Sequence, residues 1–354
     1  MTKREQQKKV ATLTDVSTRA KVSTATVSRC LNSPEQVDPK TRERVMLAVE
    51  ELSYTPNYGA KIMAKRRSNT VGAVIPTMEN AIFARGLQAF QEELSLHGFT
   101  LLVASSSYQP DIEEEQIRNL VARGAEALLL IGYHRNDRIY RFLVNRQLPY
   151  VVTWAFDQNQ DHLSVGFNNQ MAMETLTETV LDLGHKDIGL ILADTAYNDR
   201  SRARLIGIKE VMKRYHIDES HLQIIETPYA IESGAMAFET LMKASVKPTV
   251  VMCGNDVLAV GALNKAKDMG LSVPEDVSIT GFDDIELASV TTPKLTTVHV
   301  PHRKMGKISA QTLVNLIAYN ETTAKSEELS TYVCLRDTLG KNTRQHLFTK
   351  SKTT

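Results

Sequence analysis

Residues 12–32 read TLTDVSTRAKVSTATVSRCLN, and this stretch decides the architecture of the N-terminal part of the chain. Apolar residues recur at helical spacing on both sides of a short turn at Val22, which predicts helices over residues 14–21 and 24–32. Ser23 is a good N-cap for the second helix. A third helix is predicted over residues 39–52, with proline in its first turn. The expected apolar seam comprises Leu13, Val16, Ala20, Val22, Val27 and Leu31.

The second predicted helix carries a polar face suited to reading DNA bases. Short donors and acceptors near a helix N-terminus, with an arginine able to fork onto guanine, are typical of a helix in the major groove. An amphipathic helix pair in any α domain would show a similar pattern, so the pattern alone leaves both interpretations open. The residues outside the seam are Thr24, Ala25, Thr26, Ser28, Arg29 and Asn32.

Charge is distributed unevenly along the 354 residues. Residues 1–69 contain 14 Lys and Arg against 7 Asp and Glu, whereas the remainder contains 28 against 34. Clustered basic residues favour a polyanionic partner, because they neutralise phosphates and release counterions.

The three cysteines, Cys30, Cys253 and Cys334, are far apart and lack metal-ligand spacing. We therefore expect free thiols in a reducing compartment, no metal and no cofactor. No run is long enough for a membrane span and the first residues lack a signal-peptide core, so we expect a cytoplasmic protein.

After Thr70 the sequence alternates short apolar strands with helical stretches. Such β-branched runs, buried on both faces, indicate parallel α/β sheets. The strands are too many for one sheet, so we predict two similar lobes, with ligands bound where strand carboxyl ends meet the cleft between them. The predicted strands cover residues 71–76, 100–104, 127–131, 150–153, 188–192, 223–226, 249–253 and 277–282.

The segment 12–32, followed by VDPKTRERVMLAVEELSYTPN, resembles the head of the lactose/galactose-repressor (LacI/GalR) family. The resemblance implies that Thr24 and Ala25 choose bases, while the other polar residues of that helix touch the backbone and base edges, with Thr14, Tyr54 and Asn57 as further contacts. It also implies a hinge helix that wedges an apolar residue into the minor groove. The wedge position is Met63, where the family usually has leucine, with Ala60 one turn earlier. Two such heads imply a homodimer on a pseudo-palindromic operator.

The body resembles the core of the same family, which is similar to periplasmic sugar-binding proteins. The fragments that carry the resemblance include VGFNN (165–169), RLIG (204–207), VVMCGNDVLAVGAL (250–263) and GLSVPEDVSITGFDD (270–284). A polyol-like ligand needs carboxylate acceptors, planar donors and an aromatic face. The resemblance and this chemistry together predict an effector site made of Phe83, Asn168, Arg200, Arg204, Tyr229, Asn255 and Asp283. Asp283 and Asn255 could instead cap helices, Arg204 could form a structural salt bridge, and the aromatic residues could be core or rim.

Two features favour an anionic effector, such as a sugar acid or a phosphosugar. Arg200, Arg202 and Arg204 lie close together, and Asn168 stands where the family usually has aspartate. The segment LNSPEQV (31–37) is also similar to gluconate-repressor members. No catalytic motif is recognisable, and His185 fits a structural turn, so we expect no enzyme and no catalytic residues. The alternatives are a solute-binding protein and a regulator without a small-molecule effector.

The expected domain boundaries follow from these readings. Residues 1–11 form a basic arm, 12–57 the helix-turn-helix domain, 58–69 the hinge and 341–354 a tail. The effector-binding core spans 70–340. Its first lobe contains about 70–167 plus 299–325, and its second 168–298 plus 326–340.

Overall fold

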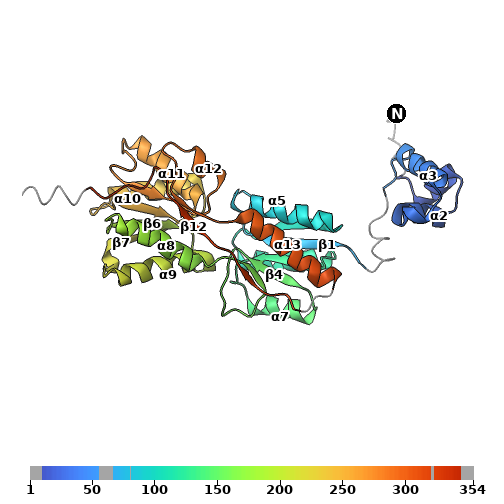
Figure 1. The fold of residues 1–354 in the computed structure, drawn as a ribbon, viewed down its shortest axis with the longest axis horizontal. Coiled ribbons are helices and arrows are strands. Elements are labelled where there is room, and N and C mark those ends of the chain that lie inside the picture. Colours follow the sequence, from blue (N-terminus) through green and yellow to red (C-terminus); the bar gives the residue numbers. More distant parts are fainter. Residues whose placement is uncertain (1–9, 56–66, 80, 320–322, 344–354) are drawn as a thin grey trace, which may run out of the picture. The chain divides into compact units, whose positions relative to one another are not determined.

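The chain divides into two compact units, Met1–Ser68 and Asn69–Thr354, in this computed structural model. The structure describes residues 10–55, 67–79, 81–319 and 323–343. Figure 1 shows a small helical head and a larger α/β body. Among the described residues, no helix combines the length and apolar character that crossing a bilayer requires.

Within residues 10–55, which the structure describes, the head contains the three α-helices that the sequence predicts: α1 (Leu13–Ala20), α2 (Thr24–Asn32) and α3 (Pro39–Glu51). Side-chain oxygens cap all three: Thr12 and Asp15 form a reciprocal capping box on α1, Ser23 accepts from Thr26 N at 3.1 Å, and Asp38 accepts from Thr41 N at 3.1 Å. A 3-10 turn, η1 (Pro34–Gln36), connects α2 to α3. The core buries Val16, Ala20, Val27, Cys30, Val45 and Ala48.

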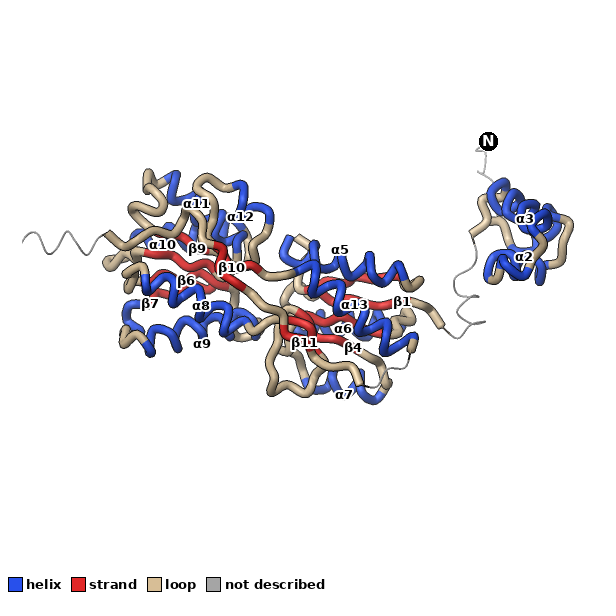
Figure 2. Tube along the Cα trace, in the orientation of Figure 1, coloured by secondary structure: helices blue, strands red, loops and turns tan. Residues whose placement is uncertain are grey.

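The first lobe of the body is a six-stranded parallel sheet in the order β11-β5-β4-β3-β1-β2. Helices α5 (Ala81–Leu96) and α13 (His302–Ala318) cover one face, and α6 (Pro110–Ala122) and α7 (Asp137–Asn145) cover the other (Figure 2). The strands are β1 (Thr70–Ile75), β2 (Thr100–Ser105), β3 (Ala127–Ile131), β4 (Tyr150–Thr153), β5 (Ser164–Gly166) and β11 (Glu327–Glu328).

The second lobe is a four-stranded parallel sheet in the order β7-β6-β8-β9. Helices α8 (Asn169–Asp182) and α9 (Asp199–Arg214) cover one face, and α10 (Ile231–Lys243) and α11 (Asp256–Asp268) the other. Its strands are β6 (Ile188–Leu192), β7 (Leu222–Glu226), β8 (Val250–Cys253) and β9 (Ser278–Thr280). Short helices η2 (Glu219–His221) and α12 (Glu286–Val290) complete it. The prediction of two parallel-sheet lobes is confirmed.

A two-stranded antiparallel ribbon joins β10 (Thr297–His299) to β12 (Tyr332–Cys334). The chain passes from β10 into α13 of the first lobe and returns through β11 to β12. The assignment of residues 326–340 to the second lobe is wrong for β11, which pairs with β5 in the first sheet. A two-residue strand carries no periodicity, so the sequence could not place it.

His185 has the structural role that the sequence predicts for it. The Nε2 atom lies 2.9 Å from the carbonyl oxygen of Gly340, and Nδ1 lies 2.9 Å from the hydroxyl of Thr249. Because a carbonyl only accepts, Nε2 is the protonated nitrogen. The ring thereby ties the start of β6 to the end of the described chain.

Candidate functional site

Helix α2 exposes the polar face that the sequence singles out. Thr24, Ala25, Ser28, Arg29 and Asn32 are exposed and Thr26 is half-buried, while Val27 and Cys30 turn into the head core. The Ser23 cap fixes the first turn of the helix, where a groove-reading helix makes its base contacts. Side-chain donors and a guanidinium are therefore presented on one rigid surface.

The structure describes two of the other head residues predicted to contact DNA, Thr14 and Tyr54. Thr14 is exposed in the first turn of α1, whereas Tyr54 is half-buried and packs against the head core. Asn57, Ala60 and Met63 lie outside the described residues.

A pocket forms between the two lobes of the body, at the carboxyl ends of parallel strands. Phe83 comes from α5, Arg200 and Arg204 from α9, and Tyr229 and Asp283 from the loops after β7 and β9. The structure thus brings together five of the seven residues predicted for the effector site. The full lining is Ile82, Phe83, Tyr108, Trp154, Asn198, Arg200, Arg204, Tyr229 and Asp283.

Asp283 is the most unusual polar group of this pocket. It is only 1% exposed, and among the described residues neither carboxylate oxygen has a hydrogen-bond partner. The nearest cation is Arg204, whose Nη2 lies 3.8 Å from Oδ1. Burial raises the pKa of Asp283 to about 7, although Arg204 and Arg200 act to lower it. A buried acceptor without a donor costs free energy, so Asp283 is suited to accept hydrogen bonds from the hydroxyl groups of a ligand.

Arg204 is held in place by the protein on several sides. Its Nε donates to Asn169 Oδ1 at 3.0 Å, its Nη1 donates to the carbonyl of Gly254, and its guanidinium stacks on Phe282 at 3.6 Å. Asn169 in turn donates to the carbonyl of Trp154 at 2.9 Å, which connects α8 to the first lobe. The salt-bridge alternative is therefore realised only in part, and the position of Arg204 is fixed before any ligand binds.

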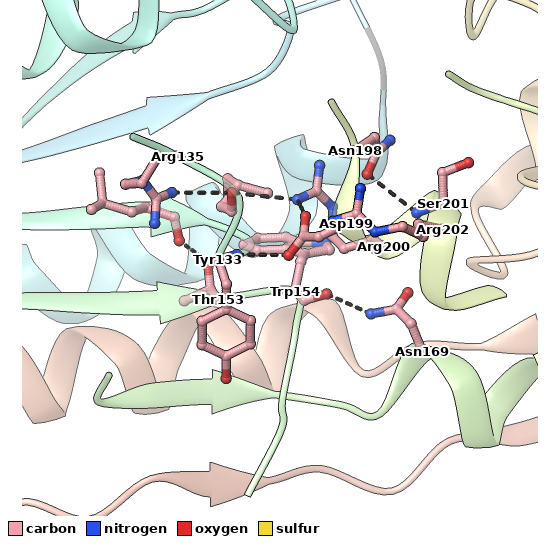
Figure 3. A network of polar contacts seen from close by, with 12 residues as sticks. Tyr133, Arg135, Thr153, Trp154, Asn169, Asn198, Asp199, Arg200, Ser201 and Arg202 are labelled. Carbon is pink, nitrogen blue, oxygen red and sulfur yellow. Dashed lines mark hydrogen bonds and ion pairs between the residues drawn. The ribbon is translucent and has the colours of Figure 1, made fainter. Parts of the chain in front are cut away.

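Asp199 and Arg200 connect the second lobe to the first, as Figure 3 shows. Asp199 Oδ2 accepts from the backbone N–H of Tyr133 at 2.7 Å, and Arg200 Nη1 lies 2.8 Å from Asp199 Oδ1. Gly132 lies under this contact with φ +69°, and a Cβ there would come within 2.0 Å of the Arg200 guanidinium. The two residues at the start of α9 thus fasten the lobes, and the left-handed backbone that they contact at Gly132 is one that favours glycine.

Asn255, Asn168 and Arg202 do not line this pocket. Asn255 is fully buried and caps α11 by accepting from Leu258 N at 2.9 Å. Asn168 caps α8 by accepting from Met171 N at 3.0 Å and lines a separate polar hollow together with Arg202. Arg202 donates to the carbonyl oxygens of Thr195 and Ala196. In the structure, Asn255 and Asn168 therefore act as helix caps.

Sequence reasoning predicted Phe83 but missed its partner Trp154 and the imidazole of His302 in the first lobe. Phe83 meets Trp154 edge to face at 5.3 Å. The Trp154 indole N–H donates to His302 Nδ1 at 3.2 Å, so His302 Nε2 carries a proton and donates to the carbonyl of Asp283 at 3.0 Å. Burial lowers the pKa of His302 to about 4, which agrees with a neutral ring. The one sequence signal for Trp154 was its position directly after the predicted strand 150–153, at the end where ligands were expected to bind.

The head and the body together define a class of protein. A capped helix with an exposed polar face suits DNA, and a pocket between two parallel-sheet lobes suits a small polar molecule. The chain is therefore a DNA-binding regulator with a ligand-binding body.

Comparison with known proteins identifies the family. The family model described as "Bacterial regulatory proteins, lacI family" matches residues 12–57. The model described as "Periplasmic binding protein-like domain" matches residues 177–339. The HTH-type transcriptional repressor PurR of Aliivibrio salmonicida is 30% identical over 87% of this chain and 92% of its own length. The ribose operon repressor of Haemophilus influenzae is 29% identical, with the same two shares. The lac repressor dimer bound to operator and an anti-inducer has a TM-score of 0.81 and 26% identity, covering 94% of this chain and all of that one.

The chain belongs to the lacI family of bacterial regulatory proteins. It is an effector-regulated, DNA-binding transcriptional repressor, and its relatives are repressors rather than enzymes. The expectation of a LacI/GalR member with a helical head and a two-lobed core is confirmed.

Proposed function

We propose that this repressor binds a pseudo-palindromic operator as a cytoplasmic homodimer and that a small sugar-like metabolite in the interlobe pocket controls the operator affinity. In the head, Thr24 and Ala25 choose bases, and Arg29 forks onto a guanine. The remaining contacts to backbone and base edges are Thr14, Thr26, Ser28, Asn32, Tyr54 and Asn57, with Ala60 and Met63 at the hinge. Two similar proteins support this proposal: one is named a ribose operon repressor, and the other is the lac repressor, whose structure is titled as a dimer bound to operator.

The observation that carries the ligand half is Asp283. Its two buried oxygens have no hydrogen-bond partners among the described residues, and they lie in a pocket lined by Phe83, Trp154 and Tyr229. Vicinal hydroxyls can donate to both oxygens, while the aromatic rings cover the apolar face of a sugar. A carboxylate between aromatic rings therefore supports a polyhydroxylated ligand.

The charges around the pocket bear on the choice among sugars. Arg202 is committed to its own loop, which reduces the arginine-rich stretch to two residues near the ligand. Arg200 is paired with Asp199 at 2.8 Å and Arg204 approaches Asp283 at 3.8 Å. Each guanidinium thus has an acidic neighbour, which favours a neutral sugar over the sugar acid or phosphosugar, such as gluconate, that the sequence pattern favours.

Coupling between pocket and operator follows from the position of the ligand. Residues from both lobes line the pocket, so a ligand that bridges Phe83 and Asp283 stabilises one lobe arrangement over another. A ligand shifts such an equilibrium only by the difference between its affinities for the two arrangements. We expect this difference to reach the operator through the dimer.

The test is a thermal-shift screen of neutral sugars, sugar acids and phosphosugars on the wild-type protein and on Asp283→Asn. A true effector should raise the melting temperature of the wild type and lose that effect in the variant. Asp187→Asn is the matched control, because Asp187 contacts His221 within the second lobe, away from the pocket. Fluorescence anisotropy on palindromic DNA then asks whether the stabilising compound changes the operator affinity. Stabilisation without an effect on DNA would support the solute-binding alternative, and specific DNA binding that no compound changes would remove the effector.

A further inference from the structure

A cluster of three different donor side chains lies outside the pocket, where the crossover ribbon meets the loop after β9. Asp284 belongs to that loop, His299 ends β10 and Cys334 ends β12. In the ribbon His299 pairs with Tyr332 and Thr297 pairs with Cys334, so His299 and Cys334 occupy one face of it. A bridge between Asp283 and His299 then aligns the Asp284 loop with β10. Backbone pairing, rather than flexible side chains, brings these groups together.

The three donor atoms already converge. Asp284 Oδ2 lies 2.8 Å from His299 Nδ1 and 3.7 Å from Cys334 Sγ, and all three atoms lie within 4.8 Å of one another. A tetrahedral zinc ion holds its ligands at about 2.0–2.3 Å, which places neighbouring donors roughly 3.2–3.8 Å apart. Small side-chain rotations suffice to reach that spacing.

We propose that Asp284, His299 and Cys334 bind a divalent cation of the zinc class. Imidazole nitrogen, thiolate sulfur and carboxylate oxygen are the donors that zinc prefers, whereas calcium and magnesium require oxygen. Among the described residues, this is the one group of three or more His, Cys, Asp or Glu side chains whose donor atoms all lie within 4.8 Å of one another. Binding replaces the thiol proton of Cys334, which passes to solvent, and the sulfur coordinates as a thiolate. The proton that His299 Nδ1 shares with Asp284 moves to Nε2 as the ring changes tautomer, which frees the Nδ1 lone pair for the cation.

The neighbours of the cluster orient its ligands. Arg336 Nη2 lies 2.6 Å from Asp284 Oδ1, which leaves Oδ2 for the cation, and Arg336 also donates to the carbonyl of Leu295 at 2.9 Å. The Tyr332 ring stacks on His299 at 4.7 Å. Such outer contacts fix the direction of a ligand atom. The positive charge of Arg336 also opposes the cation, so we expect an exchangeable site with a solvent molecule as fourth ligand.

The position of the site gives it a consequence for the pocket. A cation there connects β10 and β12 to the loop that carries Asp283. The chain leaves for the first lobe after β10 and returns from it at β12. Asp283 precedes the proposed ligand Asp284 and has its own backbone N–H bound to Val298 at 3.0 Å. Zinc would therefore stiffen the backbone on which the pocket carboxylate stands.

The test uses full-length, chelator-treated protein in a phosphine reductant. Titration with Co²⁺ should give one ion per chain and a sulfur-to-cobalt charge-transfer band, and Zn²⁺ should displace the cobalt. Cys334→Ser should abolish the band, and Cys334→Ser or His299→Gln should weaken Zn²⁺ binding at least about tenfold. His221→Gln is the matched control, because His221 and Asp187 form a similar pair at 2.7 Å that lacks a cysteine. This control should leave the affinity unchanged.

A second measurement needs no variant. Zn²⁺ should slow alkylation of the half-buried Cys334, followed by mass spectrometry, while the buried Cys30 and Cys253 serve as internal references. A cobalt spectrum without a sulfur band, Zn²⁺ binding that Cys334→Ser leaves intact, or an alkylation rate that Zn²⁺ does not change would each overturn the proposal.

Discussion

Arg29 is the head residue whose removal best separates base reading from electrostatics. It is exposed on α2, and among the described residues its guanidinium makes no hydrogen bond within the head. We expect Arg29→Ala to weaken specific operator binding by about 5–150-fold, equivalent to ~1–3 kcal/mol for a lost bidentate contact to guanine. Fluorescence anisotropy on specific and scrambled duplexes measures the loss.

The control for this prediction removes an equal charge elsewhere on the head. Arg44 is exposed on α3, outside the proposed reading face. Arg44→Ala should weaken binding to the specific and the scrambled duplex equally, and by a smaller factor than Arg29→Ala weakens specific binding. Equal losses in the two variants would exclude Arg29 from base recognition.

His302 links the two lobes in its neutral form and gives stability a defined pH dependence. Its pKa in the folded protein is about 4 because of burial, against an ordinary value of 6.5, so only the unfolded chain takes up this proton between these values. The stability contributed by neutral His302 is therefore present above pH 6.5 and is lost as pH falls towards 4. The loss amounts to at most about 3 kcal/mol.

The measurement is urea unfolding of the wild type and His302→Gln across this pH range. We expect the stability difference between them to shrink as pH falls from 7.5 to 4.5, because the variant has no imidazole to protonate. A difference that is constant with pH would show that His302 acts through packing alone.

At the scale of elements, the start of α9 determines how the lobes are fastened. Asp199 accepts from the Tyr133 N–H and pairs with Arg200, while Arg204 one turn later anchors the pocket. One helix thus supplies both an interlobe contact and a pocket wall. This arrangement depends on Gly132, whose left-handed backbone lets the loop after β3 approach the helix.

We predict that Asp199→Ala loosens this contact. The amide of Tyr133 should exchange with deuterium about tenfold faster or more, since a charge-assisted hydrogen bond to it contributes ~1.5–3 kcal/mol. Hydrogen exchange with mass spectrometry reports this amide, and Asp187→Ala, which loses a contact confined to the second lobe, is the comparison. Unchanged exchange at Tyr133 would mean that the lobes stay together without Asp199.

At the scale of the whole molecule, we predict a limited coupling between effector and operator. Allosteric coupling energies are typically ~1–3 kcal/mol per site, so a saturating effector should change operator affinity by about 5–150-fold. Anisotropy titrations with and without the effector measure this factor. Reciprocity requires that operator DNA change the effector affinity by the same factor, and calorimetry that finds no such change would contradict the two-state description.

The sequence by itself determined the three helices of the head and the alternation of strands and helices in the body. Ser23 as a cap, the apolar seam through Val16 and Val27, and strands such as β3 and β4 are set by neighbours within a few residues. Periodicity and capping are local signals, so they can be read without the fold. The family motifs added the positions of Asp283 and Arg204 in advance.

Only the tertiary structure decided which polar groups face the pocket. Asn255 and Asn168 turned out to cap helices, whereas Trp154 and Tyr108 entered the pocket from the loops that follow two strands. His302, on a helix far away in sequence, supports the pocket from behind through the carbonyl of Asp283. The cluster of Asp284, His299 and Cys334 likewise exists because β10 and β12 pair across the crossover. Such groups meet only when separate strands end at the same edge, and that is a property of the packed sheets rather than of any local stretch of sequence.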